Sequence, residues 1–271
     1  MNLRIPILMY HQVSEEPDPN FLEYSVTTKA FSKQIKILKL LGFESITLTK
    51  LVDFMQGRTN LPHKPIIITF DDGTQDAIDN AVPILEDSGF SAVFFIPTNY
   101  VGRKSSWMLS TVNTEFQVID WATVRKLDSK GFEIGAHSMS HPHLDQIPTI
   151  DCQKELEGSR RILEELLDHE VRHMAYPFGD YDERVRELAH EAGYYTACTT
   201  EEKIANSKDH MLALPRLNIG MQDTLIDFVI KVFTAKTPIR DLDMKLRILG
   251  SKFPKPVKQF ITKYLINRKP S

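Results

Sequence analysis

Two carboxylates and two histidines stand out in this sequence, because each pair comes directly after a short run of apolar residues. Asp71 and Asp72 follow one such run, and His137 and His141 follow another. Side chains four residues apart share one face of a helical turn, so both imidazoles can converge on a single ion. Histidines at this spacing are weak evidence by themselves, but Asp72 would complete a set of two histidines and one carboxylate. The pattern predicts a site for one divalent metal ion.

Adjacent carboxylates in a confined site suggest a division of roles, because two like charges oppose joint ionisation. A cation bound to Asp72 would relieve this repulsion and leave Asp71 to accept a proton from water. Asp71, Asp72 and Gly73 are also typical residues of a tight turn. The two interpretations are compatible, since Gly73 would let the backbone bend sharply beside the site.

The elements around these residues alternate between apolar runs and helical patterns. The expected strands cover 5–10, 45–48, 65–70, 92–96, 132–135, 174–176, 195–198 and 212–219. The expected helices begin near Thr27, Thr49, Gly73, Trp121, Ile150 and Asp182 and end near Gly42, Gly57, Ser88, Asp128, Leu167 and Glu191. Apolar strands separated by helices indicate parallel strands buried on both faces. The predicted fold is α/β, a distorted (β/α) barrel of about seven parallel strands, and its closure stays open.

The order of the elements also predicts where the polar residues lie. In parallel barrels, functional side chains stand at the carboxyl ends of the strands. The aspartate pair and the histidine pair each come just after an expected strand. We therefore expect them to meet at one end of the barrel.

The composition is that of a soluble, well-packed protein, since 42% of its 271 residues are hydrophobic and 25% are charged. Cys152 and Cys198 lie far apart with no metal-ligand spacing, so both are expected to be free thiols. The N-terminal segment lacks the features of a signal peptide, and no run approaches the roughly 20 apolar residues that span a bilayer. These features predict a cytoplasmic protein.

A net charge of −3 hides an asymmetry between the C-terminal segment and the rest of the chain. Residues 231–271 carry a charge of +9, and the remainder carries −12. We expect a barrel domain at 1–225 and a basic, helical extension at 226–271. The extension either covers the barrel or binds anionic lipid at the inner face of the membrane. No sequence motif supports a nucleic-acid partner.

Four ordered motifs resemble those of the NodB-type polysaccharide deacetylases, carbohydrate esterase family four. The sequence TFDDG at 69–73 is similar to the first motif of the family, and HSMSH at 137–141 is similar to the second. The sequences ILMYH at 7–11 and AYPFGDY at 175–181 resemble the subgroup that acts on poly-N-acetylglucosamine. The resemblance extends over most of the chain, from about residue 5 to about residue 220.

The resemblance implies a metal ion held by Asp72, His137 and His141, with Asp71 as the base that activates water. Zinc suits imidazole and carboxylate ligands, and nickel, cobalt, manganese or iron would fit a similar set. The resemblance also implies that the backbone N–H of Phe178 helps the ion to stabilise the oxyanion.

The chain departs from the family's pattern in two places. Many members carry an arginine two residues before the third-motif proline, where this chain has Ala175; Arg216 from a different strand could reach Asp71 instead. The late Leu-x-Leu-His motif, whose histidine acts as the acid in many members, is absent. His11 is the expected replacement as proton donor to the leaving amine.

Four residues are assigned to substrate binding. Tyr176 and Pro177 belong to the third motif, and Trp107 and Tyr181 would stack on a sugar ring. A core role for these last two side chains fits the sequence equally well. His143 is expected to be a supporting or surface residue.

Taken together, these residues favour a metal-dependent hydrolase that removes N-acetyl groups from amino sugars in a glycan or a lipid-linked saccharide. Two alternatives stay open. The same fold and ligands would serve a related amidohydrolase that acts on a small cyclic amide or imide. A non-catalytic carbohydrate-binding protein is disfavoured, because such a protein has no chemical reason to keep both aspartates and both histidines.

Overall fold

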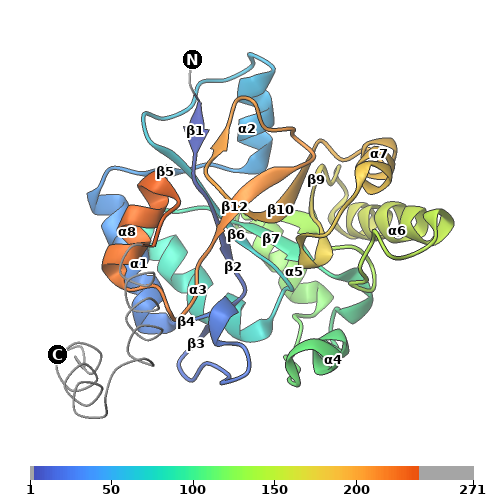
Figure 1. Cartoon of the computed structure of the whole chain (residues 1–271), viewed down its shortest axis with the longest axis horizontal. Helices are drawn as coiled ribbons and strands as arrows, with labels where there is room; N and C mark the ends of the chain where they lie inside the picture. The colour runs from blue at the N-terminus through green and yellow to red at the C-terminus, as the bar shows by residue number, and fades with distance from the viewer. Residues whose placement is uncertain (1–2, 238–271) are drawn as a thin grey trace, which may run out of the picture.

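Seven parallel strands form a closed barrel at the centre of the computed structural model, which describes residues 3–237 (Figure 1). The barrel strands are β2 (Ile7–Tyr10), β6 (Pro65–Phe70), β7 (Val93–Ile96), β8 (Glu133–Ala136), β9 (His173–Ala175), β10 (Thr196–Glu202) and β12 (Leu214–Asn218). Around the barrel they follow the order β2, β12, β10, β9, β8, β7 and β6, and β6 pairs with β2 to close the ring. Every pairing in the ring is parallel. The predicted barrel is confirmed, and its closure is established.

Further short strands of the described chain lie outside the ring. They are β1 (Arg4–Ile5), β3 (Gln12–Ser14), β4 (Ser25–Thr27), β5 (Glu44–Ser45) and β11 (Ala205–Asn206). Strand β1 pairs with β11 in the antiparallel sense, β3 pairs with β4, and β5 pairs with the beginning of β6. The pairs β1–β11 and β3–β4 are separate small sheets, and only β5 is joined to a barrel strand, so the parallel ring stays intact.

Helices form most of the connections and cover the outside of the barrel (Figure 1). The α-helices are α1 (Thr28–Leu40), α2 (Leu48–Met55), α3 (Gln75–Ser88), α4 (Leu109–Val112), α5 (Trp121–Ser129), α6 (Thr149–Leu167), α7 (Glu183–Glu191) and α8 (Leu225–Thr234). Short 3-10 helices are η1 (Leu22–Tyr24), η2 (Thr98–Tyr100), η3 (Ser106–Met108) and η4 (Pro177–Gly179). Thr27 caps α1 and Asp120 caps α5, because each side chain accepts a hydrogen bond from an N–H of the first helical turn. Cys152 and Cys198 are buried free thiols, as expected.

Some of the expected boundaries are wrong. The strand expected at 5–10 is interrupted at Pro6, which has no N–H to continue the pairing. The second expected strand is only two residues long, because α2 begins earlier than its sequence pattern suggested. Thr47, and not Thr49, caps this helix, since the Thr47 side chain accepts a hydrogen bond from the N–H of Lys50.

Alternate residues of each barrel strand face the interior, because side chains in a strand point to opposite sides in turn. Along β6 the inward face runs from Ile67, in the apolar interior, to Asp71 at the carboxyl end. Along β8 the same face carries Glu133 at the amino end and His137 at the carboxyl end. The interior between the two ends is filled by apolar side chains. Polar residues therefore gather at both ends of the barrel.

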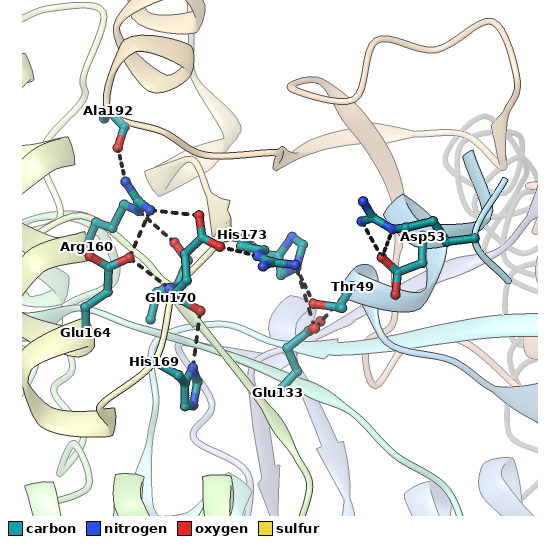
Figure 2. Close-up of polar contacts among 12 residues, drawn as sticks. Thr49, Asp53, Glu133, Arg160, Glu164, His169, Glu170, His173 and Ala192 are labelled. Atoms are coloured by element: carbon teal, nitrogen blue, oxygen red, sulfur yellow. Dashed lines mark hydrogen bonds and ion pairs between the residues drawn. The ribbon is translucent and has the colours of Figure 1, made fainter. Parts of the chain in front are cut away.

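At the amino end, a polar cluster joins β8, β9, β10 and α2. Figure 2 shows Glu133, His173 and Thr49 of this cluster. The Glu133 carboxylate accepts hydrogen bonds from the N–H groups of Leu48 (2.7 Å) and Thr49 (3.0 Å), which stabilises the first turn of α2. The buried ring of His173 contacts the Thr196 hydroxyl through Nδ1 (2.8 Å) and the Thr49 hydroxyl through Nε2 (2.9 Å). Both nitrogens have partners, so His173 is a structural histidine.

A second polar cluster, centred on Arg160, holds α6 in place (Figure 2). The Arg160 guanidinium donates hydrogen bonds to the carbonyl oxygens of Val171 (3.0 Å) and Ala192 (2.8 Å). It also pairs with Glu164 at 2.9 Å and Glu170 at 3.3 Å. These contacts tie α6 to the loop before β9 and to the end of α7.

The last described helix, α8, packs against α1. Phe228 and Val232 are buried, and the buried Lys231 ammonium contacts the Asn218 carbonyl and the Asp223 carboxylate, both at 2.7 Å. The basic segment beyond residue 237 lies outside the described residues, so the function of the tail and the domain boundary at residue 225 stay predictions. Within residues 3–237, no helix is long and apolar enough to cross a membrane.

Candidate active site

The residues expected to perform chemistry come together at the carboxyl ends of the strands, around a cavity of about 250 Å³. Its wall contains His11 after β2, Asp71 and Asp72 after β6, and His137 and His141 after β8. These residues are distant in sequence. The barrel brings them together because parallel strands end at the same rim.

Asp72, His137 and His141 form a group whose ligand atoms face one another. Asp72 Oδ1 lies 3.5 Å from His137 Nε2 and 3.3 Å from His141 Nε2, and all three side chains are buried. Ligand atoms about 2.1 Å from a zinc ion at tetrahedral angles would lie about 3.4 Å apart. Asp72 Oδ1 has no hydrogen-bond partner among the described residues, and a bound cation would satisfy it. The three residues therefore fit a divalent metal ion.

The protein also orients these ligands. His137 Nδ1 lies 2.8 Å from the carbonyl oxygen of Ala175, which places the proton on Nδ1 and leaves the Nε2 lone pair free. Burial by itself would raise the pKa of Asp72, but the imidazoles of His137 and His141 hold this pKa well below its usual range. The carboxylate is therefore ionised, which is the state that a metal ligand requires.

The two histidines do not share a helical turn, so the geometric reason inferred from their spacing is wrong. Residues 137–141 form an irregular turn, in which Ser138 (φ 56°) and His141 (φ 58°) are left-handed. The Ser138 hydroxyl accepts a hydrogen bond from the His141 N–H at 3.0 Å. The other loop bends in a similar way, since φ is 70° at Asp72 and 60° at Gly73. The sharp bend predicted at Gly73 is present.

Asp71 is held by Arg216 from β12, on the opposite side of β2. Nη1 and Nη2 of Arg216 lie 2.6 and 2.7 Å from Oδ1 and Oδ2 of Asp71. Arg216 also donates to the Thr199 carbonyl (2.9 Å) and the Thr69 hydroxyl (3.1 Å), and it is fully buried. Burial would raise the pKa of Asp71, but the Arg216 charge lowers it. The contact anticipated in place of the family's usual arginine is present.

His11 reaches the same carboxylate from β2. Its Nε2 lies 3.8 Å from Asp71 Oδ2, and its ring packs at an angle against Tyr24 with centroids 4.9 Å apart. Nδ1 of His11 is buried without a hydrogen-bond partner among the described residues. Burial lowers the pKa of His11, while Asp71 and Asp72 offset part of this effect. His11 therefore borders the cavity beside Asp71.

Aromatic rings surround the second histidine ligand. Trp107 stacks on His141 with centroids 4.8 Å apart, and Phe178 meets the same ring edge-on at 4.6 Å. Phe178 has φ 59° and stacks on His143 at 3.9 Å. His143 Nδ1 lies 2.9 Å from Asp180 Oδ2. His143 is thus part of the wall of the cavity.

The four residues assigned to substrate binding are placed differently. Trp107 and Tyr176 line the cavity. The Tyr176 hydroxyl, however, donates to the Leu212 carbonyl at 2.9 Å, and its ring stacks on Tyr181 at 4.9 Å. Pro177 and Tyr181 are not among the described residues that line the cavity. Their predicted contact with substrate has no support in the geometry.

Other lining residues were not identified from the sequence. They are Phe21, Tyr24, Met108, Thr111, Val112 and Thr200. Most belong to two loops, one after β3 and one after β7, which have no recognisable motif or spacing. They make much of the wall apolar, which is typical of a small-molecule site.

A closed parallel barrel with aspartates and histidines at its carboxyl rim has the arrangement of a barrel enzyme. The chain belongs to the polysaccharide deacetylase family, whose sequence model matches residues 58–197. The matched segment includes Asp71, Asp72, His137 and His141, whereas Arg216 lies beyond it. The family resemblance inferred from the motifs is confirmed.

Named bacterial proteins are similar to this chain. The putative polysaccharide deacetylase YxkH of Bacillus subtilis is 29% identical over 218 residues, covering 80% of this chain and 72% of the relative. The poly-beta-1,6-N-acetyl-D-glucosamine N-deacetylase of Staphylococcus epidermidis is 25% identical, covering 79% and 78% of the two chains.

Solved structures support the fold. The Streptococcus pyogenes deacetylase PplD in complex with acetate superposes with a TM-score of 0.74 at 22% identity, covering 86% of this chain and 99% of its own. IcaB from Ammonifex degensii gives a TM-score of 0.72 at 22% identity, covering 86% and 97%. At these identities the two structures establish the shared barrel.

Proposed function

We propose that this protein is a divalent-metal-dependent hydrolase that removes N-acetyl groups from amino sugars in a glycan or a lipid-linked saccharide. Membership of the polysaccharide deacetylase family supports N-deacetylation of a glycan. The observation that carries the metal dependence is the unpartnered Asp72 Oδ1 between two imidazole nitrogens. The name of the staphylococcal relative makes chains of N-acetylglucosamine the first substrate to test.

Asp72, His137 and His141 would hold the ion. When bound, a divalent ion polarises the acetamide carbonyl and lowers the pKa of a water molecule beside it. Asp71 borders the same cavity, and its carboxylate would accept the proton that this water loses. Arg216 keeps the carboxylate oriented because it donates hydrogen bonds to both oxygens, and its positive charge lowers the pKa of Asp71, which favours the ionised form.

Two further groups would act on the amide as it breaks. His11 lies beside Asp71 and would donate the proton that the leaving amine requires. The backbone N–H of Phe178, in a left-handed residue at the cavity wall, would donate to the oxyanion. Trp107 would contact the sugar, since its ring covers His141 on the cavity side.

Acetate release tests this proposal most directly. Purified wild type and Asp71→Asn would be incubated with N-acetylglucosamine oligomers and with a lipid-linked N-acetyl sugar, with and without added zinc. We expect metal-dependent acetate release by wild type and its loss in Asp71→Asn. No acetate from either substrate, despite one bound metal ion per chain, would overturn the proposal and favour a hydrolase of small cyclic amides.

The lipid-linked substrate connects to the prediction for the basic tail. If the enzyme works at an anionic membrane surface, removing residues 252–271 should weaken binding to anionic vesicles. Co-sedimentation of the full chain and the shortened chain measures this difference. Equal binding, or no binding by either, would reject a membrane-binding role for the tail.

A further inference from the structure

The turn that carries both histidine ligands is held by a carboxylate from a distant helix. Glu155 on α6 accepts hydrogen bonds from the N–H groups of Met139 (2.7 Å) and Ser140 (2.8 Å) through one oxygen. Its other oxygen accepts a hydrogen bond from the Ser140 hydroxyl at 2.5 Å. All three donors lie between the two ligands, so Glu155 contacts the turn without lining the cavity.

The same helix receives the side chain at the centre of the turn. Met139 packs against Gly158, one helical turn after Glu155, where an added Cβ would lie 2.3 Å from Met139 Sδ. On its other side the turn accepts backbone hydrogen bonds from Thr98 and Asn99, at 3.2 and 2.9 Å. The turn is therefore clamped between α6 and the loop after β7.

These contacts stabilise a turn of unusual conformation. Ser138 and His141 are both left-handed, a conformation that non-glycine residues adopt only when their surroundings impose it. The N–H groups between them point away from any strand or helix ladder and need an acceptor. One side-chain oxygen of Glu155 has two lone pairs and can accept hydrogen bonds from both N–H groups. Without it, the turn would gain other conformations in which the two imidazoles no longer converge.

We propose that Glu155 is a positioning residue that sets the affinity of the site for its metal ion by fixing the turn between His137 and His141. The inference rests on the metal site of the proposed function. It assigns to α6 a role in metal binding that the ligand residues themselves do not reveal. Glu155 does not touch the ion or the substrate; it acts through the backbone.

The test compares metal affinity among variants that change reach and charge separately. Glu155→Ala removes both, Glu155→Asp keeps the charge but shortens the side chain, and Glu155→Gln keeps the reach but removes the charge. Glu165→Ala is the matched control, since Glu165 is an exposed glutamate of the same helix, remote from the turn. Chelator competition with zinc gives the dissociation constant, and the visible spectrum of the cobalt-loaded protein reports ligand geometry.

We expect zinc to bind about 10- to 100-fold more weakly to Glu155→Ala, as is usual when a group supporting metal ligands is removed. Glu155→Gln should stay within about threefold of wild type, because its amide oxygen still accepts from both N–H groups. Glu155→Asp should fall between these two, with an altered cobalt spectrum. A pure charge effect would reverse the order of Asp and Gln, and would overturn the proposal.

The outcome separates this inference from the proposed function. If wild type binds one zinc ion and releases acetate while Glu155→Ala binds zinc with unchanged affinity, only the role of Glu155 is wrong. If wild type binds no metal, the proposed function itself fails. If Glu155→Ala does not fold, the zinc affinities of Glu155→Asp and Glu155→Gln still test the proposal, because both variants keep a polar side chain at this position of the helix. Equal zinc affinity and equal spectra in those two variants would reject positioning.

Discussion

The two ends of the barrel carry clusters of the same residue types, yet they differ in how their polar atoms are partnered. At the amino end, both ring nitrogens of the buried His173 have hydrogen-bond partners, and Glu133 accepts two backbone N–H groups. At the carboxyl end, Asp72 Oδ1, His11 Nδ1 and His141 Nδ1 are buried with no partner among the described residues. Buried polar atoms are normally satisfied, so the three atoms gathered at the carboxyl end favour ligand binding there.

The backbone shows the same contrast. Seven described non-glycine residues have positive φ, and four of them, Asp72, Ser138, His141 and Phe178, lie at the carboxyl end around the cavity. Left-handed residues of this kind cost free energy and persist where the surrounding structure imposes them. Burial of a histidine and a carboxylate is thus no sign of function by itself. Burial together with missing partners and a constrained backbone is a better sign.

The largest expected effect comes from removing the carboxylate at the centre of the metal group. Asp72→Ala should lose zinc binding and lower kcat by at least about a thousandfold, because a metal ion contributes several kcal/mol to the transition state. The matched variant at the other end, Glu133→Ala, should keep both properties. Zinc titration and acetate release measure them. Loss of activity in Glu133→Ala without unfolding would break the distinction between the two ends.

The second effect concerns the buried ion pair. Arg216→Met leaves Asp71 buried without its countercharge, so the free energy of unfolding should fall by about 3–5 kcal/mol. Asp71→Asn combined with Arg216→Met removes both charges and should recover much of this loss. Urea unfolding of the four proteins completes the cycle. Additive losses in the double variant would show that the pair is not coupled.

Two histidine variants compare the ends directly. His11→Gln should lower kcat by about a hundredfold or more, since it removes the proposed acid, while stability stays close to wild type. His173→Gln should instead lower the free energy of unfolding by about 1–3 kcal/mol, because it disrupts satisfied buried hydrogen bonds, and should leave kcat nearly unchanged. Acetate release and urea unfolding are measured on both. If His11→Gln lowered stability and His173→Gln lowered kcat, missing hydrogen-bond partners would not distinguish a functional histidine from a structural one.

Much of the fold could be predicted because its signals are local. The strand at Pro65–Phe70 and the helix end at Gly89 agree with the expected boundaries, since an apolar run and a left-handed glycine are visible in the sequence. Closure of the barrel was not predictable, because it depends on the pairing of β2 with β6, which no local pattern specifies.

The candidate site was likewise predictable only in part. Asp72 and His137 were identifiable by residue type and by their place after strands, whereas the left-handed turn between the histidines was not. Glu155 was missed because it lies on a helix 15 residues beyond the turn that it contacts, among other glutamates of similar pattern. Residues such as Phe21 and Val112, in the connections after β3 and β7, line the cavity only through tertiary packing.

The smallest expected effect is a pH dependence of stability that belongs to the amino-end cluster. Burial lowers the pKa of His173 below its ordinary value of 6.5, and Glu133 offsets only part of this. Arg172 also lowers this pKa, while Glu170 and Asp53 raise it. The folded protein therefore keeps His173 neutral at pH values where the unfolded chain has already bound a proton there.

Because the unfolded chain binds the extra proton, this histidine contributes its full stability above a pH of about 6.5 and loses it as the pH falls further. The loss reaches at most about 1.4 kcal/mol per pH unit. His173→Gln lacks the group but shares every other titrating residue, including the histidines at the carboxyl end. Urea unfolding of both proteins between about pH 8 and about pH 5.5 gives the difference in free energy of unfolding between wild type and His173→Gln. We expect this difference to become smaller as the pH falls. A widening gap would mean that the folded protein holds His173 protonated beside Glu133, and the amino end would then carry a buried charge pair like that of Asp71 and Arg216.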